Sequence, residues 1–441
     1  MIKLHCQKLL SLFNDENALI YIKGGVVQHR YDTDSELAFR QESNFLYLTG
    51  VEEPDFHFVL DIKSGEGHLI IPQRSVQYAV WNGIVRSKEF YQARFSPDYI
   101  HYDVELESVL TNRKPEKIYV LDRAQVAGWN LNGIALVEEG LREALVDCRL
   151  IKTEQEIEHL RHAGKMTSLA HIEVLKAVKP NKYEYELKAT FEYHCVRHGL
   201  QFQAYNGIYG SGPNSAILHY VENNRQMKDG ELFLIDSGAE WHGYAHDVTR
   251  TYPVNGSFDT LQAGVYEAVL SAHKNSIERA KPGVKMEDLH IAAAKDLLQG
   301  LKDMELVYGD LDDLMEKNVF ALFFPHGLGH FLGLDVHDPG GYPKGVERID
   351  RPGIRFLRAR RILEPGMVIT IEPGCYFIPA LLEPALQDAQ LKAYLNVRLL
   401  TDMMHFGGVR IEDNLLITPA GYENLTDIPK ERKEIESLML S

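Results

Sequence analysis

The sequence is poor in cysteine and in positive charge. Its four cysteines, Cys6, Cys148, Cys195 and Cys375, form no Cys-x-x-Cys pair, which argues against a disulfide framework in so long a chain. We therefore expect reduced thiols and a cytoplasmic protein. Lysine and arginine number 47 against 63 acidic residues, so the formal net charge is -16. A nucleic-acid partner is not expected, because such binding requires a basic surface.

Long apolar runs are also missing. No stretch approaches 18 consecutive apolar residues, so we expect neither a membrane-spanning helix nor a membrane partner. The short apolar start at residues 1–13 is interrupted too quickly for a signal peptide. Hydrophobic residues still make up 45% of the 441, which is enough for the cores of two or three domains.

The pattern of apolar residues predicts two domains that mix helices and strands. Short apolar runs at 58–60, 69–71 and 118–120, bounded by turn residues, favour buried strands, and we expect a helix at 133–143. Thr153, followed by Glu156, is a capping-box signature for a long helix. These patterns divide the chain into an α/β domain at 1–150 and a second domain at 151–441.

The second domain contains a weak internal echo. A helical run ends at Lys179-Pro180-Asn181 and another helix follows; about a hundred residues later the same happens at Lys281-Pro282-Gly283. Strand-rich stretches follow at 231–253 and 367–417. The echo indicates either an internal duplication or a chance recurrence of common helix-ending residues.

Two carboxylates flank a predicted hairpin. Asp236 ends an apolar strand and Asp247 lies on the return strand. A turn between Trp241 and His242 would place them opposite one another, roughly 5 Å apart. Carboxylates that close repel unless a cation neutralises them. The alternative is an exposed hairpin with charged residues near its turn.

Histidines gather in a glycine-rich segment, with His326, His330 and His337 within twelve residues. Pro325 and the glycines favour a loop over a regular helix. A lone histidine would be read as structural, but three together favour ligand or acid–base roles.

Two further carboxylates, Glu372 and Glu412, lie in short apolar strands or at their ends. Each alone could be part of an ion pair, with Arg410 as a candidate partner of Glu412. Together, four carboxylates and one imidazole suit Mn²⁺, Co²⁺, Fe²⁺ or Zn²⁺. Such a set can bridge two cations, as in hydrolases that activate a shared water.

These segments, in this order, resemble the pita-bread metallopeptidases, the family of methionine aminopeptidase, aminopeptidase P and prolidase. The matching segments are Ile235-Asp-Ser-Gly-Ala-Glu240, Asp247-Val-Thr-Arg-Thr, His326-Gly-Leu-Gly-His330, Val336-His-Asp, Ile371-Glu-Pro-Gly374 and Arg410-Ile-Glu-Asp413. The resemblance covers about residues 150–430, and 39–45 resemble the proline-specific members' first domain. It implies a creatinase-like N-terminal α/β domain and a pseudo-twofold pita-bread domain.

The resemblance also implies roles for individual residues. Asp236 and Asp247 would bind one metal ion, and His330 and Glu372 the other. Asp247 and Glu412 would bridge the two ions. Glu372 would in addition move protons as general base and then acid.

Five other residues have implied roles around this centre. His219 would hold the substrate near the scissile bond, and His337 would stabilise the tetrahedral intermediate. Tyr205 resembles a further tyrosine of the site, with a core tyrosine as the alternative. Thr249 and Arg410 would orient the metal ligands.

Segments 81–89, 340–358 and 406–412 resemble the prolidase branch. Arg358 matches an arginine that grips a dipeptide's C-terminal carboxylate, whereas a solvated basic surface is the simpler explanation for most arginines around it. The branch implies hydrolysis of Xaa-Pro dipeptides by a hydroxide bridging two divalent ions, Mn²⁺ first among them. It also implies a homodimer in which Trp81 reaches the neighbouring site, and an N-terminal domain that controls substrate length.

Three other functions remain open at this point. An aminopeptidase P would release the first residue from longer X-Pro peptides with the same chemistry. An inactive binding protein could keep the fold without turnover, although all five ligand positions are filled. A two-metal phosphoesterase would fit the ligands but not the ordered motifs.

Overall fold

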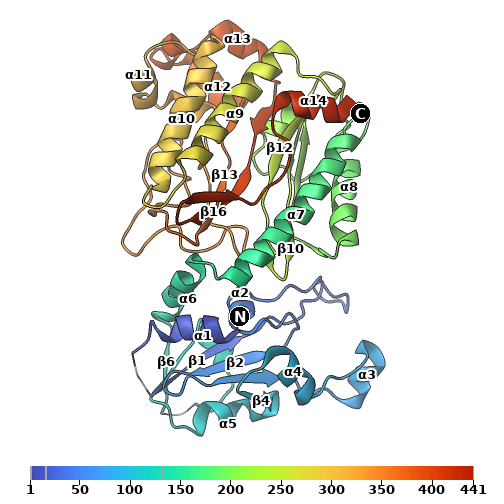
Figure 1. Ribbon diagram of the computed structural model, residues 1–441, viewed down its shortest axis with the longest axis vertical. Coiled ribbons are helices and arrows are strands. Elements are labelled where there is room, and N and C mark those ends of the chain that lie inside the picture. The colour runs from blue at the N-terminus through green and yellow to red at the C-terminus, as the bar shows by residue number, and fades with distance from the viewer. Residues whose placement is uncertain (1, 15–16, 132, 441) are drawn as a thin grey trace. The chain divides into compact units, whose positions relative to one another are not determined.

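The computed structural model describes residues 2–14, 17–131 and 133–440. The chain divides into two compact units, residues 1–149 and 150–441 (Figure 1). Among the described residues, no helix is both long and apolar enough to cross a membrane.

A six-stranded sheet forms the centre of the first unit, in the order β4-β3-β2-β1-β5-β6. The antiparallel pairs are β1 with β2 and β2 with β3, and the other neighbours are parallel. The predicted apolar runs fall on β2, β3 and β5, which confirms them as strands. The strands are β1 (Ala18–Lys23), β2 (His57–Asp61), β3 (Gly67–Ile71), β4 (Tyr99–Tyr102), β5 (Lys117–Tyr119) and β6 (Ala135–Val137).

The helix predicted at 133–143 is wrong. Residues 135–137 form strand β6, which pairs with β5 at the edge of the sheet. Gly140 has φ 88°, a left-handed conformation that ends the extended segment before the helix that begins at Leu141. The helices of this unit are α1 (Ile2–Leu10), α2 (Ser43–Thr49), α3 (Val76–Asn82), α4 (Lys88–Phe95), α5 (Leu106–Thr111) and α6 (Leu141–Leu150).

Helix α7 (Glu154–Ala177) opens the second unit with the predicted capping box. The Thr153 hydroxyl accepts from the Glu156 amide, and the Glu156 carboxylate accepts from the Thr153 amide at 2.8 Å. Leu160 and Val174 lie on the buried stripe of the helix, as their helical spacing predicts.

Two successive halves of the second unit share one arrangement, a helix pair followed by a three-stranded antiparallel sheet (Figure 1). Asn181 and Gly283, both at positive φ, turn the chain between the helices of each pair. The Lys-Pro echo therefore marks a structural repeat. The first half contains α7, α8 (Glu184–Arg197), β8 (Ile208–Ser211), β9 (Leu232–Asp236) and β12 (Thr249–Pro253); the second contains α9 (Thr260–Arg279), α10 (Met286–Asp303), β13 (Val368–Ile371), β16 (Asp413–Thr418) and β17 (Gly421–Asn424).

One apolar core joins these two halves. Its fully buried members include Leu187 of α8 and Phe233 of β9 from the first half, and Leu297 of α10 and Ile369 of β13 from the second. This packed core supports the strands and loops that carry the polar residues described in the next subsection. The remaining elements of the unit are β7 (Phe202–Gln203), β10 (Ala239–Trp241), β11 (Tyr244–Ala245), β14 (Gly374–Tyr376), β15 (Gly408–Arg410), α11 (Leu311–Glu316), α12 (Pro379–Gln387), α13 (Val397–Asp402) and the terminal helix α14 (Arg432–Leu440).

Candidate metal centre

The first pair of carboxylates lies on the β9–β12 ribbon of the first half. Asp236 ends β9, but it faces Thr249 and not Asp247 as the sequence suggested. The tight turn lies at His242 and Gly243, both at positive φ, one residue later than expected. Asp247 precedes Thr249 by two residues, so it lies diagonally from Asp236 on the same side of the ribbon.

The second half presents its carboxylates in a comparable way. Glu372 directly follows β13, and Glu412 lies in the break between β15 and β16. Ile371 of β13 faces Asp413 of β16, so both glutamates lie at the same end of this ribbon. In each half, one carboxylate lies at or directly after the end of a strand, and the other lies just ahead of that strand's antiparallel partner.

His330 lies between the two pairs, on a loop as its glycine neighbours predict. Its Nε2 is 3.3 Å from an Asp247 oxygen and 3.6 Å from a Glu372 oxygen. Its Nδ1 is 2.9 Å from the Phe331 carbonyl, which fixes the ring. Asp247, His330 and Glu412 each offer a ligand atom within 4.8 Å of the other two.

Burial and mutual repulsion dominate the electrostatics of this cluster. Burial, and then the charges of Asp247 and the other carboxylates, raise the pKa of Glu412 well above its usual range. Burial likewise raises the pKa of Glu372 to about 7. The cluster therefore carries more negative charge than it can hold ionised without a positive partner.

A divalent cation fits this donor set. Glu412 is 2% exposed; its Oε2 accepts from the Thr249 hydroxyl at 2.7 Å, while Oε1 is buried and has no partner among the described residues. Such an orphaned buried oxygen is costly unless a cation or donor meets it. Carboxylates with one imidazole suit a hydrated divalent ion. The residues available to hold metal are Asp236, Asp247, His330, Glu372 and Glu412.

Arg410 lies beside Asp236, which corrects the alternative that it neutralises Glu412. Its Nη2 donates to Asp236 Oδ2 at 2.6 Å, and its Nε donates to the Thr249 hydroxyl at 3.0 Å. The Tyr205 hydroxyl donates to Asp236 Oδ1 at 2.7 Å. Both oxygens of Asp236 are thus oriented by donors. Burial and adjacent carboxylates raise the pKa of Tyr205 well above its usual range, so the phenol remains a donor.

Two orienting residues were missed from the sequence, Asn414 and Tyr376. Asn414 accepts from the Asp247 amide at 3.0 Å and donates to the Asp247 carbonyl. The Tyr376 hydroxyl accepts from Arg410 Nη1 at 2.8 Å and lies 2.8 Å from His326 Nε2. For Asn414 there was a signal, because three polar residues in succession at 412–414 are unusual in a buried strand.

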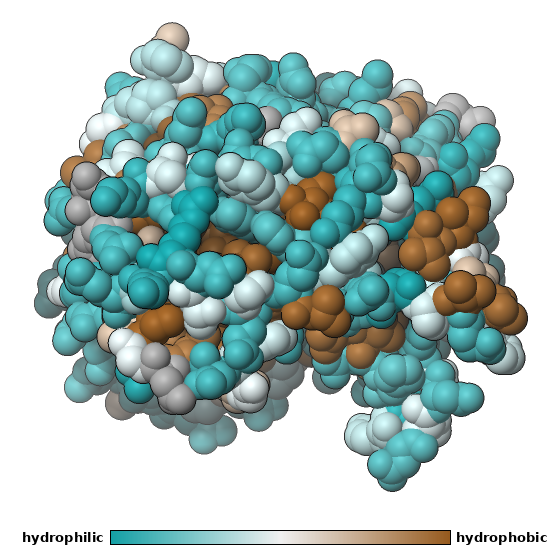
Figure 2. Space-filling view, turned by 90° about the horizontal axis from the view of Figure 1, so that it is seen from below, coloured by the Kyte–Doolittle hydropathy of each residue, from teal (hydrophilic) through white to brown (hydrophobic). Residues whose placement is uncertain are grey.

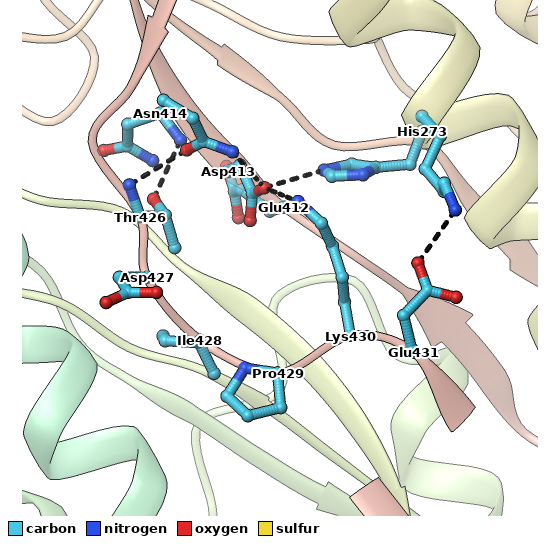
Figure 3. A network of polar contacts seen from close by, with 12 residues as sticks. His273, Glu412, Asp413, Asn414, Thr426, Asp427, Ile428, Pro429, Lys430 and Glu431 are labelled. Atoms are coloured by element: carbon cyan, nitrogen blue, oxygen red, sulfur yellow. Dashed lines mark hydrogen bonds and ion pairs between the residues drawn. The ribbon is translucent and has the colours of Figure 1, made fainter. Parts of the chain in front are cut away.

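Behind Glu412 lies a second buried charge network, shown in Figure 3. In this view Asp413 pairs with Lys430, and the His273 ring lies 3.7 Å from its carboxylate. Asp413 also pairs with Arg250 at 2.7 Å. Burial opposes ionisation of Asp413, but these cations outweigh it and hold its pKa well below the usual range. Arg250 Nη1 also donates to the Glu412 carbonyl at 2.8 Å. The network therefore fixes the backbone from which the Glu412 carboxylate projects.

Three exposed side chains, those of His337, His219 and Arg358, lie near the cluster. The His337 ring meets His330 edge to face, with centroids 4.5 Å apart. Although His337 is exposed at the surface, its ring is partly desolvated, and this desolvation lowers its pKa to about 4, with a further lowering by His330 and Arg358. His337 is therefore neutral near pH 7, and both His219 and Arg358 are close enough to affect it.

Arg358 differs from the arginines around it. It is exposed and makes no hydrogen bond with any described residue, whereas the other five bond within the chain. The solvated surface expected for most of them is only partly correct, since three are half-buried. The five bonded arginines are Arg348, Arg351, Arg355, Arg360 and Arg361.

Comparison with known proteins agrees with this geometry. Residues 158–419 match Metallopeptidase family M24, and residues 3–119 match the N-terminal domain of aminopeptidase P. The chain belongs to family M24. The predicted metallopeptidase and its two-part α/β fold, with a pita-bread second domain, are thereby confirmed. M24 enzymes need divalent metals, in accord with the donor set described above.

Relatives within M24 carry two kinds of name. The chain is 42% identical to the Xaa-Pro dipeptidase of Homo sapiens, over 96% of this chain and 88% of the relative. It is 36% identical to a probable Xaa-Pro aminopeptidase of Verticillium alfalfae, over 96% and 92%. Among solved structures, zinc-substituted E. coli aminopeptidase P in complex with product has a TM-score of 0.84, 31% identity and coverage of 100% and 97%.

Proposed function

We propose that this chain hydrolyses Xaa-Pro dipeptides and releases free proline. The observation that carries the proposal is Arg358, an exposed guanidinium that makes no hydrogen bond with a described residue and whose charge acts on His337. A guanidinium fork suits a carboxylate, and in a dipeptide the C-terminal carboxylate belongs to the proline itself. The dipeptidase relatives support the same substrate class.

The proposed centre holds two divalent ions, with Mn²⁺ the first choice and Co²⁺, Fe²⁺ or Zn²⁺ able to use the same ligands. Asp236, Asp247, His330, Glu372 and Glu412 would hold these ions, with Asp247, His330 and Glu412 already grouped in the structure. When bound, such a pair supplies a hydroxide nucleophile near neutral pH and polarises the scissile carbonyl.

The chain's own residues supply the remaining steps. Glu372 would take a proton from the nucleophile and pass it to the leaving proline nitrogen. Neutral His337 donates a hydrogen bond to the oxygen that becomes negative, and His219 holds the peptide at the scissile bond. Tyr205, Thr249 and Arg410 keep the carboxylates oriented. An X-Pro bond has no amide hydrogen, and none of these contacts requires one.

Release of proline from Gly-Pro, compared with cleavage of Gly-Pro-Ala under Mn²⁺ after chelation, tests the proposal. We expect cleavage of the dipeptide alone. Arg358→Ala should raise KM for Gly-Pro by about 10- to 100-fold, because a charge-assisted bidentate contact is lost. The matched control is Arg355→Ala, since Arg355 is exposed and pairs with Asp350 instead.

Each other result would select a different function. Efficient cleavage of the tripeptide would move the assignment to an Xaa-Pro aminopeptidase, the name of the fungal relatives. Hydrolysis of a phenyl phosphate in place of either peptide would indicate a phosphoesterase. No turnover of any substrate by metal-loaded protein would indicate a binding protein.

We infer a cytoplasmic homodimer, in which the domain of residues 1–150 mediates association and limits substrate length. Val76, Val80 and Trp81 of α3 are 87%, 69% and 80% exposed, and apolar surface of this kind marks association sites. Figure 2 shows brown side chains at the right edge of this face, the side on which Figure 1 draws α3. Light scattering should give twice the chain mass for wild type and less for Trp81→Glu. All four cysteines are buried, which suits a reducing compartment.

A further inference from the structure

The loop that carries His219, residues 212–224, has both ends tied to a single buried carboxylate. Glu184, in the first turn of α8, is 0% exposed. Its Oε1 accepts from the amide and hydroxyl of Ser211, both at 2.7 Å, just before the loop. Its Oε2 accepts from the Arg225 amide at 2.9 Å, just after the loop.

The same carboxylate also reaches the neighbour of His219. The Tyr220 hydroxyl donates to Glu184 Oε2 at 2.7 Å. Tyr220 is 5% exposed, so this residue is anchored while its neighbour points outward. Burial and this contact raise the pKa of Tyr220 to about 12, which keeps its hydroxyl a donor. Glu184 therefore holds the loop at three points along its length.

A neighbouring ion pair supports the buried charge of Glu184. Arg225 pairs in a bidentate way with Glu231, at 2.5 and 2.6 Å, and also donates to the Ser211 hydroxyl at 2.9 Å. Buried carboxylates with several donors and a nearby cation form rigid networks. Ser215 attaches the loop to strand β15, because its hydroxyl accepts from the Gly408 amide at 2.8 Å.

His219 itself is exposed and makes no hydrogen bond with any described residue. Its position is therefore set by the backbone that carries it, and that backbone is held by Glu184. We propose that Glu184 is a positioning residue, which fixes loop 212–224 and thereby aims His219 at the peptide. The inference rests on the proposed function, because it gives His219 a purpose in substrate binding.

Glu184→Gln tests the inference with little change of volume. An amide in place of the carboxylate would direct an N–H group at one arm of the loop, where it would face the Arg225 amide donor or the Ser211 amide donor. The control is Glu186→Gln in the same helical turn, because Glu186 is exposed and its carboxylate accepts from the Tyr183 amide, outside loop 212–224. Tyr220→Phe removes one bond alone and serves if Glu184→Gln does not fold.

Two measurements decide the matter. Hydrogen exchange of amides in 212–224 should be at least tenfold faster in Glu184→Gln, and less so in Tyr220→Phe, while Glu186→Gln stays at the wild-type rate. With Gly-Pro, kcat/KM should fall by about 10- to 100-fold in Glu184→Gln, and adding it to His219→Ala should give little further loss.

Unchanged exchange in both Glu184→Gln and Tyr220→Phe would overturn the anchoring role. Fully additive losses in the double variant would overturn the action through His219, since independent sites add. If wild type cleaves no Xaa-Pro peptide, the proposed function fails, whereas the exchange comparison still accepts or rejects Glu184 as the anchor of the loop.

Discussion

At Glu412 one carboxylate oxygen accepts from Thr249 and the other has no partner among the described residues. The hydrogen bond from Thr249 orients the side chain, and the oxygen without a described partner is available to a cation. Thr249 serves two residues at once, because its hydroxyl also accepts from Arg410 Nε. One hydroxyl thus links a candidate ligand to the arginine that orients Asp236.

Replacing Thr249 by valine should lower the affinity for Mn²⁺ by about 10- to 100-fold, the usual effect of losing a contact behind a metal ligand. Titration calorimetry of chelator-treated protein measures this. Thr251→Val is the control on the same strand, since its hydroxyl donates to the Arg410 carbonyl and does not contact a ligand carboxylate. Equal affinities in the two variants would contradict the orienting role of Thr249.

Individual candidates could be predicted from the sequence because their motifs are local. Asp236, Asp247 and His330 lie in short sequence motifs, and each motif can be recognised without knowing the tertiary structure. Their mutual geometry could not be predicted in the same way, because it depends on where a turn falls: a shift by one residue in the turn moved Asp236 opposite Thr249. The partner of Arg410 depends on packing between distant strands and was not accessible either.

Helix α7 is tied to the His337 loop by a buried ion pair. Lys152 Nζ is 3.0 Å from Asp338 Oδ2, and both side chains are 1% exposed. Lys152 directly precedes the capping residue Thr153, and Asp338 directly follows His337. The start of one element therefore fixes the end of a loop far along the chain.

Lys152→Met should destabilise the fold by about 3 kcal/mol, because it removes the ammonium group from a buried carboxylate. Urea unfolding of the metal-loaded protein measures the loss. The Lys152→Met, Asp338→Asn double variant should recover part of it, since the charge that remained is gone. A single variant within 0.5 kcal/mol of wild type, on the order of a surface pair, would reject the structural importance of this contact.

The elements that could be predicted were those decided by their own residues. The capping box of Thr153 and Glu156 is contained within one turn, and α7 begins where it indicates. The helix prediction for residues 135–137 was wrong because their backbone pairs with strand β5, and local periodicity does not reveal this neighbour. Lys152 and Asp338 are nearly two hundred positions apart, so their pairing also required the tertiary structure.

Several histidines of the second unit are fully buried and neutral. Burial lowers their pKa from 6.5 to about 3 or 4, while in the unfolded chain the ordinary value returns. Above pH 6.5 both states are neutral and stability is intact. As the pH falls from 6.5 towards 4, the unfolded state takes up protons that the folded state refuses, so stability is lost. These residues are His171, His246, His273 and His290.

For each such histidine the slope is about 1.4 kcal/mol per pH unit. His290→Asn should reduce the pH dependence of the unfolding free energy by up to that amount between pH 4 and 6.5, because one titrating group is removed. Asparagine can still accept from the Leu328 amide, as His290 Nδ1 does at 3.1 Å. Urea unfolding at a series of pH values, at fixed Mn²⁺, tests this. An identical slope in wild type and variant would show that His290 is not held neutral.

The repeat within the second unit affects the order in which the candidate ligands become available during synthesis. Asp236 and Asp247 belong to the first half, whereas His330, Glu372 and Glu412 follow only after the helix pair α9–α10. During translation the early carboxylates leave the ribosome long before the residues that complete the set. The nascent chain therefore cannot assemble the full set of candidate ligands until Glu412, close to its C-terminal end, has emerged.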